Sequence, residues 1–238
     1  MCQKRKAIFN WSGGKDSTLA LHRIFKEKKF EVTGLLTTLN KQYNRISMHG
    51  VRAELLERQA NSLGIPLYKV MLPELADMET YETIMQRVTN SFKEQGISVF
   101  IFGDLFLEDI RAYREKQLQG TGLKPEFPIW HYPTLQAAKD FIDAGYKAVI
   151  TSVDASRLDT SFAGRYFDEA FLKDLPTGVD PCGENGEFHT FVFDGPLFSK
   201  PVNFKLGETV HKSYSLNDKS VSSGFYFTDI IPSGNFSD

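Results

Sequence analysis

The sequence has few cysteines and no long apolar run. Cys2 and Cys182 are the two cysteines among 238 residues, and neither belongs to a C-x-x-C pair, so no disulfide framework is expected. No apolar run approaches the roughly 20 residues that a membrane span needs. The first residues are charged and lead directly into a short apolar stretch, which is unlike a signal peptide. These absences predict a cytoplasmic protein with no membrane partner.

A strong charge of either sign is also missing. The 28 lysines and arginines nearly balance 30 aspartates and glutamates, for a formal net charge of −2. Such a chain has no general electrostatic attraction to nucleic acid, and no nucleic-acid partner is expected. With 238 residues, 41% of them hydrophobic, it is long enough for one large domain or for two small domains that share an interface.

Apolar stretches alternate with amphipathic ones along most of the chain. We expect strands at residues 7–11, 31–39, 66–71 and 97–102, helices at 18–28, 49–63, 77–95 and 105–119, and then a helix at 134–144 and a strand at 148–153 that continue the alternation. Strands that are apolar on both faces and alternate with helices indicate α/β architecture with a Rossmann-like parallel sheet.

The last third of the sequence has a different character. Residues 180–198 are rich in glycine and proline, and short strands are expected at 188–193, 204–212 and 224–230. This pattern predicts a smaller C-terminal α+β domain. We place the N-terminal domain at residues 1–120 and the C-terminal domain at 121–238.

One loop carries most of the chemical information. It joins the first strand to the first helix with adjacent glycines, which allow positive φ and expose backbone N–H groups at a helix N-terminus, an arrangement that binds phosphate. Asp16 offers either a helix cap or a ligand for a phosphate-bound Mg²⁺. An ordinary turn with a helix cap is the alternative interpretation. The loop consists of Ser12, Gly13, Gly14, Lys15, Asp16 and Ser17.

Further site residues are expected at the same edge of the sheet. Right-handed crossovers bring the carboxyl ends of parallel strands together, and ligands bind there. Thr37 and Thr38 follow the second strand and are candidate ligand-binding residues. Gly103 and Asp104 follow the fourth strand, where Asp104 is a candidate for holding the metal or its water.

A second motif, E-N-G-E-F-H-T, combines carboxylates with an imidazole. Strand alternation predicts that Glu187 and His189 share one face, and with Glu184 they are candidate catalytic residues. A solvated polar turn is the plain alternative. A zinc site that includes Cys182 is a weaker one, because the spacing matches no common zinc motif.

The two motifs together resemble the diphthine–ammonia ligase family, a group of PP-loop ATP pyrophosphatases with an adenine-nucleotide alpha-hydrolase-like fold. S-G-G-K-D-S, P-C-G-E-N-G-E-F-H-T and D-G-P-L-F carry the resemblance. The segments at residues 48–52, 63–66, 103–109 and 127–130 extend it over nearly the whole chain. The resemblance implies an enzyme that uses ATP and Mg²⁺ to adenylate a carboxylate, releases AMP and pyrophosphate, and transfers ammonia to the acyl group.

The resemblance also implies an ATP-binding domain at residues 1–120, with the adenine beside Thr37 and Thr38, and a substrate domain at 121–238. Glu184, Glu187 or His189 would then bind ammonium or accept its proton.

The chain also departs from that family. The family motif is closer to E-G-G-E-x-E-T, with glutamate where this chain has His189, and the eukaryotic ligase carries further C-terminal domains. The chain therefore looks like a prokaryotic single-chain relative. The resemblance leaves open whether the carboxylate belongs to a protein or to a small molecule, and a homo-oligomer is compatible with it.

Two other functions remain as alternatives. A tRNA-thiolating PP-loop enzyme would need a persulfide-carrying cysteine, for which Cys182 is the candidate, and a basic surface. A non-catalytic adenine-nucleotide sensor would need no acidic motif in the C-terminal domain. Three arginines, Arg111, Arg114 and Arg165, are candidates for binding a substrate anion, although each by itself is expected on a solvated surface.

Overall fold

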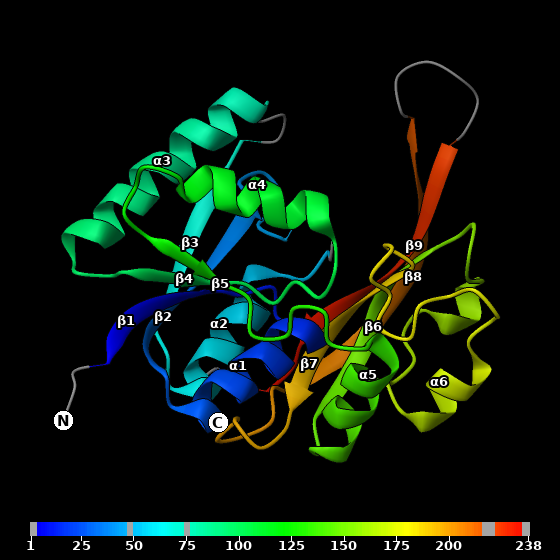
Figure 1. Cartoon of the computed structure of the whole chain (residues 1–238). Helices are drawn as coiled ribbons and strands as arrows, with labels where there is room; N and C mark the ends of the chain where they lie inside the picture. The colour runs from blue at the N-terminus through cyan, green and yellow to red at the C-terminus, as the bar shows by residue number, and fades with distance from the viewer. Residues whose placement is uncertain (1–3, 47–49, 74–76, 216–221, 235–238) are drawn as a thin grey trace.

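A parallel sheet forms the N-terminal part of the computed structural model, which describes residues 4–46, 50–73, 77–215 and 222–234. The sheet has five strands in the order β3-β2-β1-β4-β5, and all neighbouring pairs are parallel (Figure 1). This confirms the predicted Rossmann-like α/β architecture. The strands are β1 (Arg5–Asn10), β2 (Phe30–Asn40), β3 (Leu67–Leu72), β4 (Val99–Ile101) and β5 (Lys124–Glu126).

Helices cover both faces of this sheet. On β1, Ala7 and Phe9 belong to the apolar core that the first two helices line, while Ile8 belongs to the core under the third helix. Both faces of the strand are therefore buried, which explains its continuous apolar sequence. The four helices are α1 (Lys15–Glu27), α2 (Ala53–Leu63), α3 (Met78–Glu94) and α4 (Glu108–Leu118).

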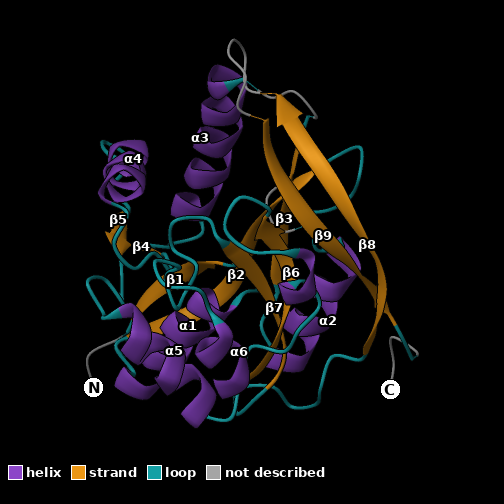
Figure 2. Ribbon diagram, turned by 90° about the vertical axis from the view of Figure 1, so that its right-hand side faces the viewer, coloured by secondary structure: helices purple, strands orange, loops and turns teal. Residues whose placement is uncertain are grey.

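The C-terminal part forms a separate antiparallel sheet with strand order β7-β6-β9-β8 (Figure 2). The prediction that the α/β alternation continues through residues 134–153 is wrong, because β6 joins this second sheet. Six consecutive buried residues make β6 look like a parallel strand, and its partner β7 lies much later in the sequence. The elements are α5 (Thr134–Asp143), β6 (Lys147–Asp154), η1 (Thr160–Phe162), α6 (Glu169–Asp174), β7 (Phe188–Asp194), β8 (Phe204–Ser215) and β9 (Ser222–Pro232).

One apolar core joins the two sheets. It contains Trp11 and Leu56 from the N-terminal part together with Phe141, Val149 and Phe191 from the C-terminal part. In the chain order, β5 lies beyond residue 120 and still pairs with β4. The division into 1–120 and 121–238 stays a prediction, and the shared core means that neither part is packed independently of the other.

Several predicted boundaries differ from the observed ones. The helix predicted from residue 49 begins at Ala53, and residues 47–49 lie outside the described part. The strand β5 has the sequence K-P-E and was not predicted, because it is short and carries no apolar alternation.

In the ranges that the structure describes, no helix is both long enough and apolar enough to cross a membrane.

Candidate active site

The loop at residues 12–17 turns sharply between β1 and α1. Gly13 has φ of +76°, and a Cβ atom there would lie 2.7 Å from Gln59 Oε1. A side chain at this position would therefore clash as well as strain the backbone. The hydroxyl of Ser12 donates to Ser17 Oγ at 3.0 Å and accepts the N–H of Gly14 at 3.3 Å. The helix begins at Lys15 with Gly14 at its N-cap and no side-chain cap, so Asp16 lies in the first turn and does not cap it.

A fully buried glutamine holds this loop in place. The amide nitrogen of Gln59 on α2 donates to the carbonyls of Gly13 at 2.9 Å and of Val192 at 2.5 Å, and its oxygen accepts the indole N–H of Trp11 at 2.9 Å. The side chain thus ties the loop to Trp11, directly after β1, and to β7 at once. The sequence does not reveal the role of Gln59, because a single polar residue on an amphipathic helix gives no signal of its burial.

The second motif is in direct contact with the loop. The backbone N–H of Lys15 donates to the hydroxyl of Thr190 at 3.0 Å, and the N–H of Val192 donates to the carbonyl of Gly13 at 2.9 Å. Thr190 therefore satisfies one of the first N–H groups of α1, a role that a helix N-cap residue usually plays. Two segments about 175 residues apart in the chain thereby form one site.

These segments line a cavity of about 570 Å³. Most of the predicted residues lie on its wall, and Gly13, Glu187, Thr37 and Thr38 do not. Arg114, from α4, and Phe225, from β9, add a cation and an aromatic ring. The lining includes Ser12, Gly14, Lys15, Asp16, Ser17, Gly103, Asp104, Glu184 and His189.

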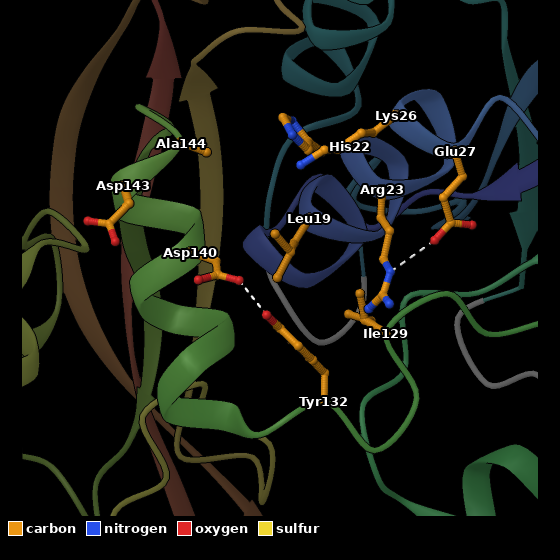
Figure 3. Close-up of a pocket in the computed structure, with 10 residues that line it drawn as sticks. All are labelled: Leu19, His22, Arg23, Lys26, Glu27, Ile129, Tyr132, Asp140, Asp143 and Ala144. Atoms are coloured by element: carbon orange, nitrogen blue, oxygen red, sulfur yellow. Dashed lines mark hydrogen bonds and ion pairs between the residues drawn. The ribbon is translucent and has the colours of Figure 1, made fainter.

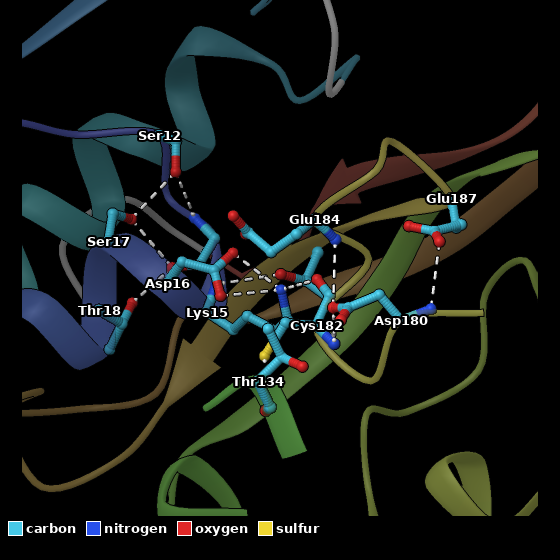
Figure 4. A network of polar contacts seen from close by, with 12 residues as sticks. Ser12, Lys15, Asp16, Ser17, Thr18, Thr134, Asp180, Cys182, Glu184 and Glu187 are labelled. Atoms are coloured by element: carbon cyan, nitrogen blue, oxygen red, sulfur yellow. Dashed lines mark hydrogen bonds and ion pairs between the residues drawn. The ribbon is translucent and has the colours of Figure 1, made fainter. Parts of the chain in front are cut away.

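Lys15 is the buried cation of the site. Its ammonium group bonds both oxygens of Asp16, at 2.9 and 2.8 Å, and the carbonyl of Cys182 (Figure 4). It also lies 5.4 Å from the ring centroid of Phe188. Burial is the largest single effect and by itself would lower the pKa of Lys15, but the neighbouring acidic groups, of which Asp16 is the strongest, together raise that pKa above its ordinary value. Lys15 therefore stays charged at neutral pH.

The carboxyl groups on the cavity wall outnumber the single ammonium group of Lys15. Burial raises the pKa of Asp104, and the nearby charge of Asp16 adds to the effect. Burial, followed by the Asp16 charge, raises the pKa of Glu184 to about 8, and its side chain extends toward the loop in Figure 4. The wall thus favours groups that bring positive charge, such as a metal-bound phosphate or an ammonium ion.

Glu187 has a different place from Glu184. It is 2% exposed, and its carboxylate accepts the N–H groups of Asp180 at 3.1 Å and of Asn185 at 2.9 Å. The side chain amide of Asn185 adds a third hydrogen bond at 3.0 Å. The structure does not bring Glu187 together with His189 in the cavity, because its oxygens are turned inward to close the loop of residues 180–187.

His189 is the second residue of β7, and it lines the cavity. Burial, and then the nearby Lys15 charge, lowers the pKa of its imidazole to about 4. The ring is therefore neutral at physiological pH, so it offers a neutral donor or acceptor and no positive charge.

Thr37 and Thr38 line a neighbouring pocket of about 270 Å³. Leu36, Trp11, Tyr81 and Met85 give it apolar walls, which suit a flat heterocycle. Asn10, Ser12 and Arg114 line both this pocket and the larger cavity. The two hollows are therefore adjacent, with these three residues at their border.

Gly103 and Asp104 lie where β4 ends. A Cβ atom on Gly103 would be 2.9 Å from Ser17 Cα, so glycine is needed for the close approach of this turn to α1. Asp104 Oδ2 and Arg114 Nε are both buried, lie 3.8 Å apart, and have no hydrogen-bond partner within the described ranges. This pair is a ready contact point for a further polar group.

Cys182 is poorly suited to sulfur transfer. It is 2% exposed, its thiol donates to the carbonyl of Thr134 at 3.1 Å, and burial raises its pKa. A thiol of this kind is a weak nucleophile. Cys2 lies outside the described residues. Among the residues that are described, no three His, Cys, Asp or Glu side chains are grouped to hold a metal ion, so the zinc interpretation gains no support.

Two predicted arginines lie away from the cavity. Arg111 bonds Glu115 at 2.8 Å and stacks 4.7 Å from the centroid of Trp130, and Arg165 bonds Asp174 at 2.8 Å.

A separate hollow of about 610 Å³ lies between α1 and α5 (Figure 3). Its polar groups are largely paired with one another, as Tyr132 is with Asp140, and it contains no residue of either motif.

Comparison with known proteins identifies related sequences. The diphthamide synthase N-terminal domain matches residues 5–125, and the diphthamide synthase C-terminal domain matches residues 133–220. A mouse (Mus musculus) protein named diphthine–ammonia ligase is 25% identical over 85% of this chain and 84% of its own length. Its counterpart from rat (Rattus norvegicus) is 24% identical over 84% of this chain and 82% of its own length.

A third relative tests the expected difference in length. The Schizosaccharomyces pombe protein of the same name is 27% identical over 57% of this chain, and the match covers 22% of that protein. The expectation that eukaryotic relatives extend far beyond this chain therefore holds for the yeast protein. It is wrong for the two rodent proteins, most of whose length is matched.

Proposed function

The chain belongs to the diphthamide synthase family, and from that premise we propose that it adenylates a substrate carboxylate and then transfers ammonia to the acyl group. Membership makes it an ATP-dependent carbon–nitrogen ligase. The hydrogen bond between Lys15 N–H and Thr190 carries the proposal, because it joins the loop and the acidic motif in one cavity. Two successive half-reactions on one acyl group need that closeness.

In the first half-reaction, a carboxylate oxygen of the substrate attacks the α-phosphorus of ATP. The bond from this phosphorus to the bridging oxygen breaks, and pyrophosphate leaves with its negative charge. We assign its stabilisation to the N–H groups at the start of α1, the hydroxyls of Ser12 and Ser17, and the charge of Lys15. The adenine is assigned to the pocket beside Thr37 and Thr38.

Mg²⁺ fits the acidic wall of the cavity. Asp104 has a buried oxygen without a hydrogen-bond partner in the described chain, and Asp16 lies on the same wall. Mg²⁺ is commonly held by one or two carboxylates together with phosphate oxygens and water, so it needs no cluster of three protein ligands. Asp16 and Asp104 would hold it, and it would neutralise charge on the phosphates.

We assign Arg114 to the reacting anion. It lies at the junction of the two hollows, and its Nε atom has no hydrogen-bond partner among the described residues. An anion placed there would contact the guanidinium group while the base occupies one hollow and the pyrophosphate the other. The residue would then orient either the α-phosphate or the attacking carboxylate.

In the second half-reaction, the nitrogen of ammonia attacks the acyl carbon. The carbon–oxygen bond to AMP breaks, AMP leaves, and one proton of the nitrogen moves to a base. Glu184 is the base that we propose, because its pKa of about 8 makes it a stronger proton acceptor than an ordinary carboxylate. His189 is assigned to hydrogen bonding in its neutral form, and Glu187 to positioning the 180–187 loop.

The products of turnover test this proposal. With candidate carboxylates, ammonium, ATP and Mg²⁺, we expect AMP and pyrophosphate, together with an amide detected by mass spectrometry. Formation of ADP and phosphate would contradict adenylation. Gly13→Ala/Gly14→Ala should abolish ATP binding, whereas Glu184→Gln should bind ATP and slow amide formation at least tenfold. If ATP binds and no carboxylate is ever converted, the nucleotide-sensor function replaces this one.

A further inference from the structure

The edge of the second sheet is a long exposed strand. β8 is hydrogen-bonded on one side to β9 and is the outermost strand of the sheet, as Figure 2 shows. Eight of the nine residues from Lys205 to Ser213 are exposed, with Gly207 half-buried. Such an edge presents backbone N–H and C=O groups that a further strand can pair with.

The opposite edge of the same sheet is already covered. The N–H of Val192 on β7 donates to the carbonyl of Gly13, and the carbonyl of Phe193 accepts the N–H of Val202 at 2.7 Å. The fold therefore closes one edge with its own backbone, whereas no described residue pairs with the outer edge of β8.

Side chains on β8 make the open edge self-complementary. From Thr209 onward, β8 pairs regularly with β9, and Val210 and Lys212 alternate onto one face. Glu208 lies directly before Thr209, inside the irregularity of the ladder between Leu206 and Thr209, and alternation from Val210 assigns it to the same face. In the described chain neither Glu208 nor Lys212 forms an ion pair.

We propose that β8 pairs antiparallel with β8 of a second copy of this chain, centred on Val210. Two-fold symmetry then places Val210 opposite its own copy and Glu208 opposite Lys212 of the partner, twice. Opposite charges and apolar side chains in directly facing positions stabilise a strand pair. A register shifted by two residues toward the tip would instead set Lys212 against Lys212, which is repulsive.

The interface would be narrow, so a weak dimer is expected. A pair of edge strands buries less surface than the roughly 1,200–2,000 Å² of a standard stable interface. The contact also lies next to the candidate active site, because Lys212 faces Phe225 of β9 across the ladder and Phe225 lines the main cavity. The inference depends on the sheet edge and not on the proposed reaction.

Charge reversal tests the pairing and its register. Sedimentation velocity over low to several hundred micromolar protein should show a monomer–dimer equilibrium for the wild type. Glu208→Lys and Lys212→Glu should each raise the dissociation constant roughly tenfold, since both symmetry-related pairs become repulsive. A mixture of the two variants should restore dimerisation, because every facing pair in the heterodimer is then opposite in charge.

The double variant E208K/K212E should also dimerise like the wild type. Circular dichroism and thermal unfolding of all variants check that they are folded, which is expected because both residues are exposed. A wild type that stays monomeric at every concentration would overturn the proposal. So would a dimer that is insensitive to the single reversals, or single variants whose mixture does not associate.

Discussion

Glu184 shows how burial can change the chemistry of one residue. Its carboxyl lies on the wall of the cavity with Asp16 and Asp104, and the removal of water raises its pKa to about 8. Glu187, three residues away, receives three hydrogen bonds that close its own loop. Two glutamates of one short motif thus have different surroundings: Glu184 faces the cavity, whereas Glu187 closes the loop. Their identical side chains give no sign of this difference in the sequence.

The raised pKa of Glu184 predicts how stability depends on pH. The folded protein holds the proton of this carboxyl up to about pH 8, whereas the unfolded chain releases it near the ordinary value of about 4.3. The stability that Glu184 contributes is therefore present at low pH and is lost as the pH rises through about 8. Without ATP and Mg²⁺, the denaturant concentration at the unfolding midpoint of the wild type should therefore fall as the pH rises from about 4.3 to about 8.

Glu184→Gln isolates this residue. In this variant the denaturant midpoint should fall much less between pH 6 and pH 8, since glutamine does not titrate. Its amide formation, measured at a constant concentration of free ammonia, should also lose the increase with pH that the wild type shows. Identical pH profiles for the two proteins would contradict the assigned pKa and the role as a base.

At the scale of elements, the contact between α1 and β7 organises the site. Thr190 accepts the N–H of Lys15 at 3.0 Å, and Gln59 holds the loop from the other side. The sequence predicted the loop, the first helix and β7 because each has a strong local pattern. It did not predict that a threonine of the second motif completes the N-terminus of α1, because nothing in local sequence reports a contact across the fold.

Thr190→Val should weaken both stability and nucleotide binding. Valine keeps the shape and removes the acceptor, which leaves the Lys15 N–H unpaired in a buried place at a cost of about 1–3 kcal/mol. Thr190→Ser keeps the oxygen and should retain most of the stability. Chemical unfolding and ATP titration of the purified variants measure the two effects.

Thr151→Val provides a matched control on β6. The hydroxyl of Thr151 is buried and has no hydrogen-bond partner in the part of the chain described, so the same substitution should be neutral or stabilising. Equal losses at Thr190 and Thr151 would show that the hydrogen bond to α1 contributes nothing particular.

At the scale of the whole molecule, the sequence predicted two architectures correctly and did not predict how they share a core. The parallel sheet follows from apolar strands separated by helices, and the C-terminal α+β part from short strands between glycine and proline. The strand β6 was assigned to the wrong sheet, because a strand buried on both faces has the same pattern in either one.

The shared core predicts that the chain unfolds as one unit. Leu56 and Phe191 are fully buried in the cluster that spans both sheets, while Phe92 belongs to the separate cluster under α3. Calorimetry of the intact chain should give a single transition whose calorimetric and van't Hoff enthalpies agree. Phe191→Ala and Phe92→Ala should each lower the free energy of unfolding by about 3–5 kcal/mol. Both should lower the midpoint temperature of that same transition.

ATP provides the second half of this test. A ligand that binds the folded state alone stabilises everything that unfolds with its site. ATP should therefore raise the transition temperature of the wild type and of both phenylalanine variants by similar amounts, although the two substitutions lie on different sides of the sheet. If Phe191→Ala split the transition, with ATP shifting one component, the two sheets would be separate folding units. The contact between Lys15 and Thr190 would then be a docking interaction between them, and not part of a common core.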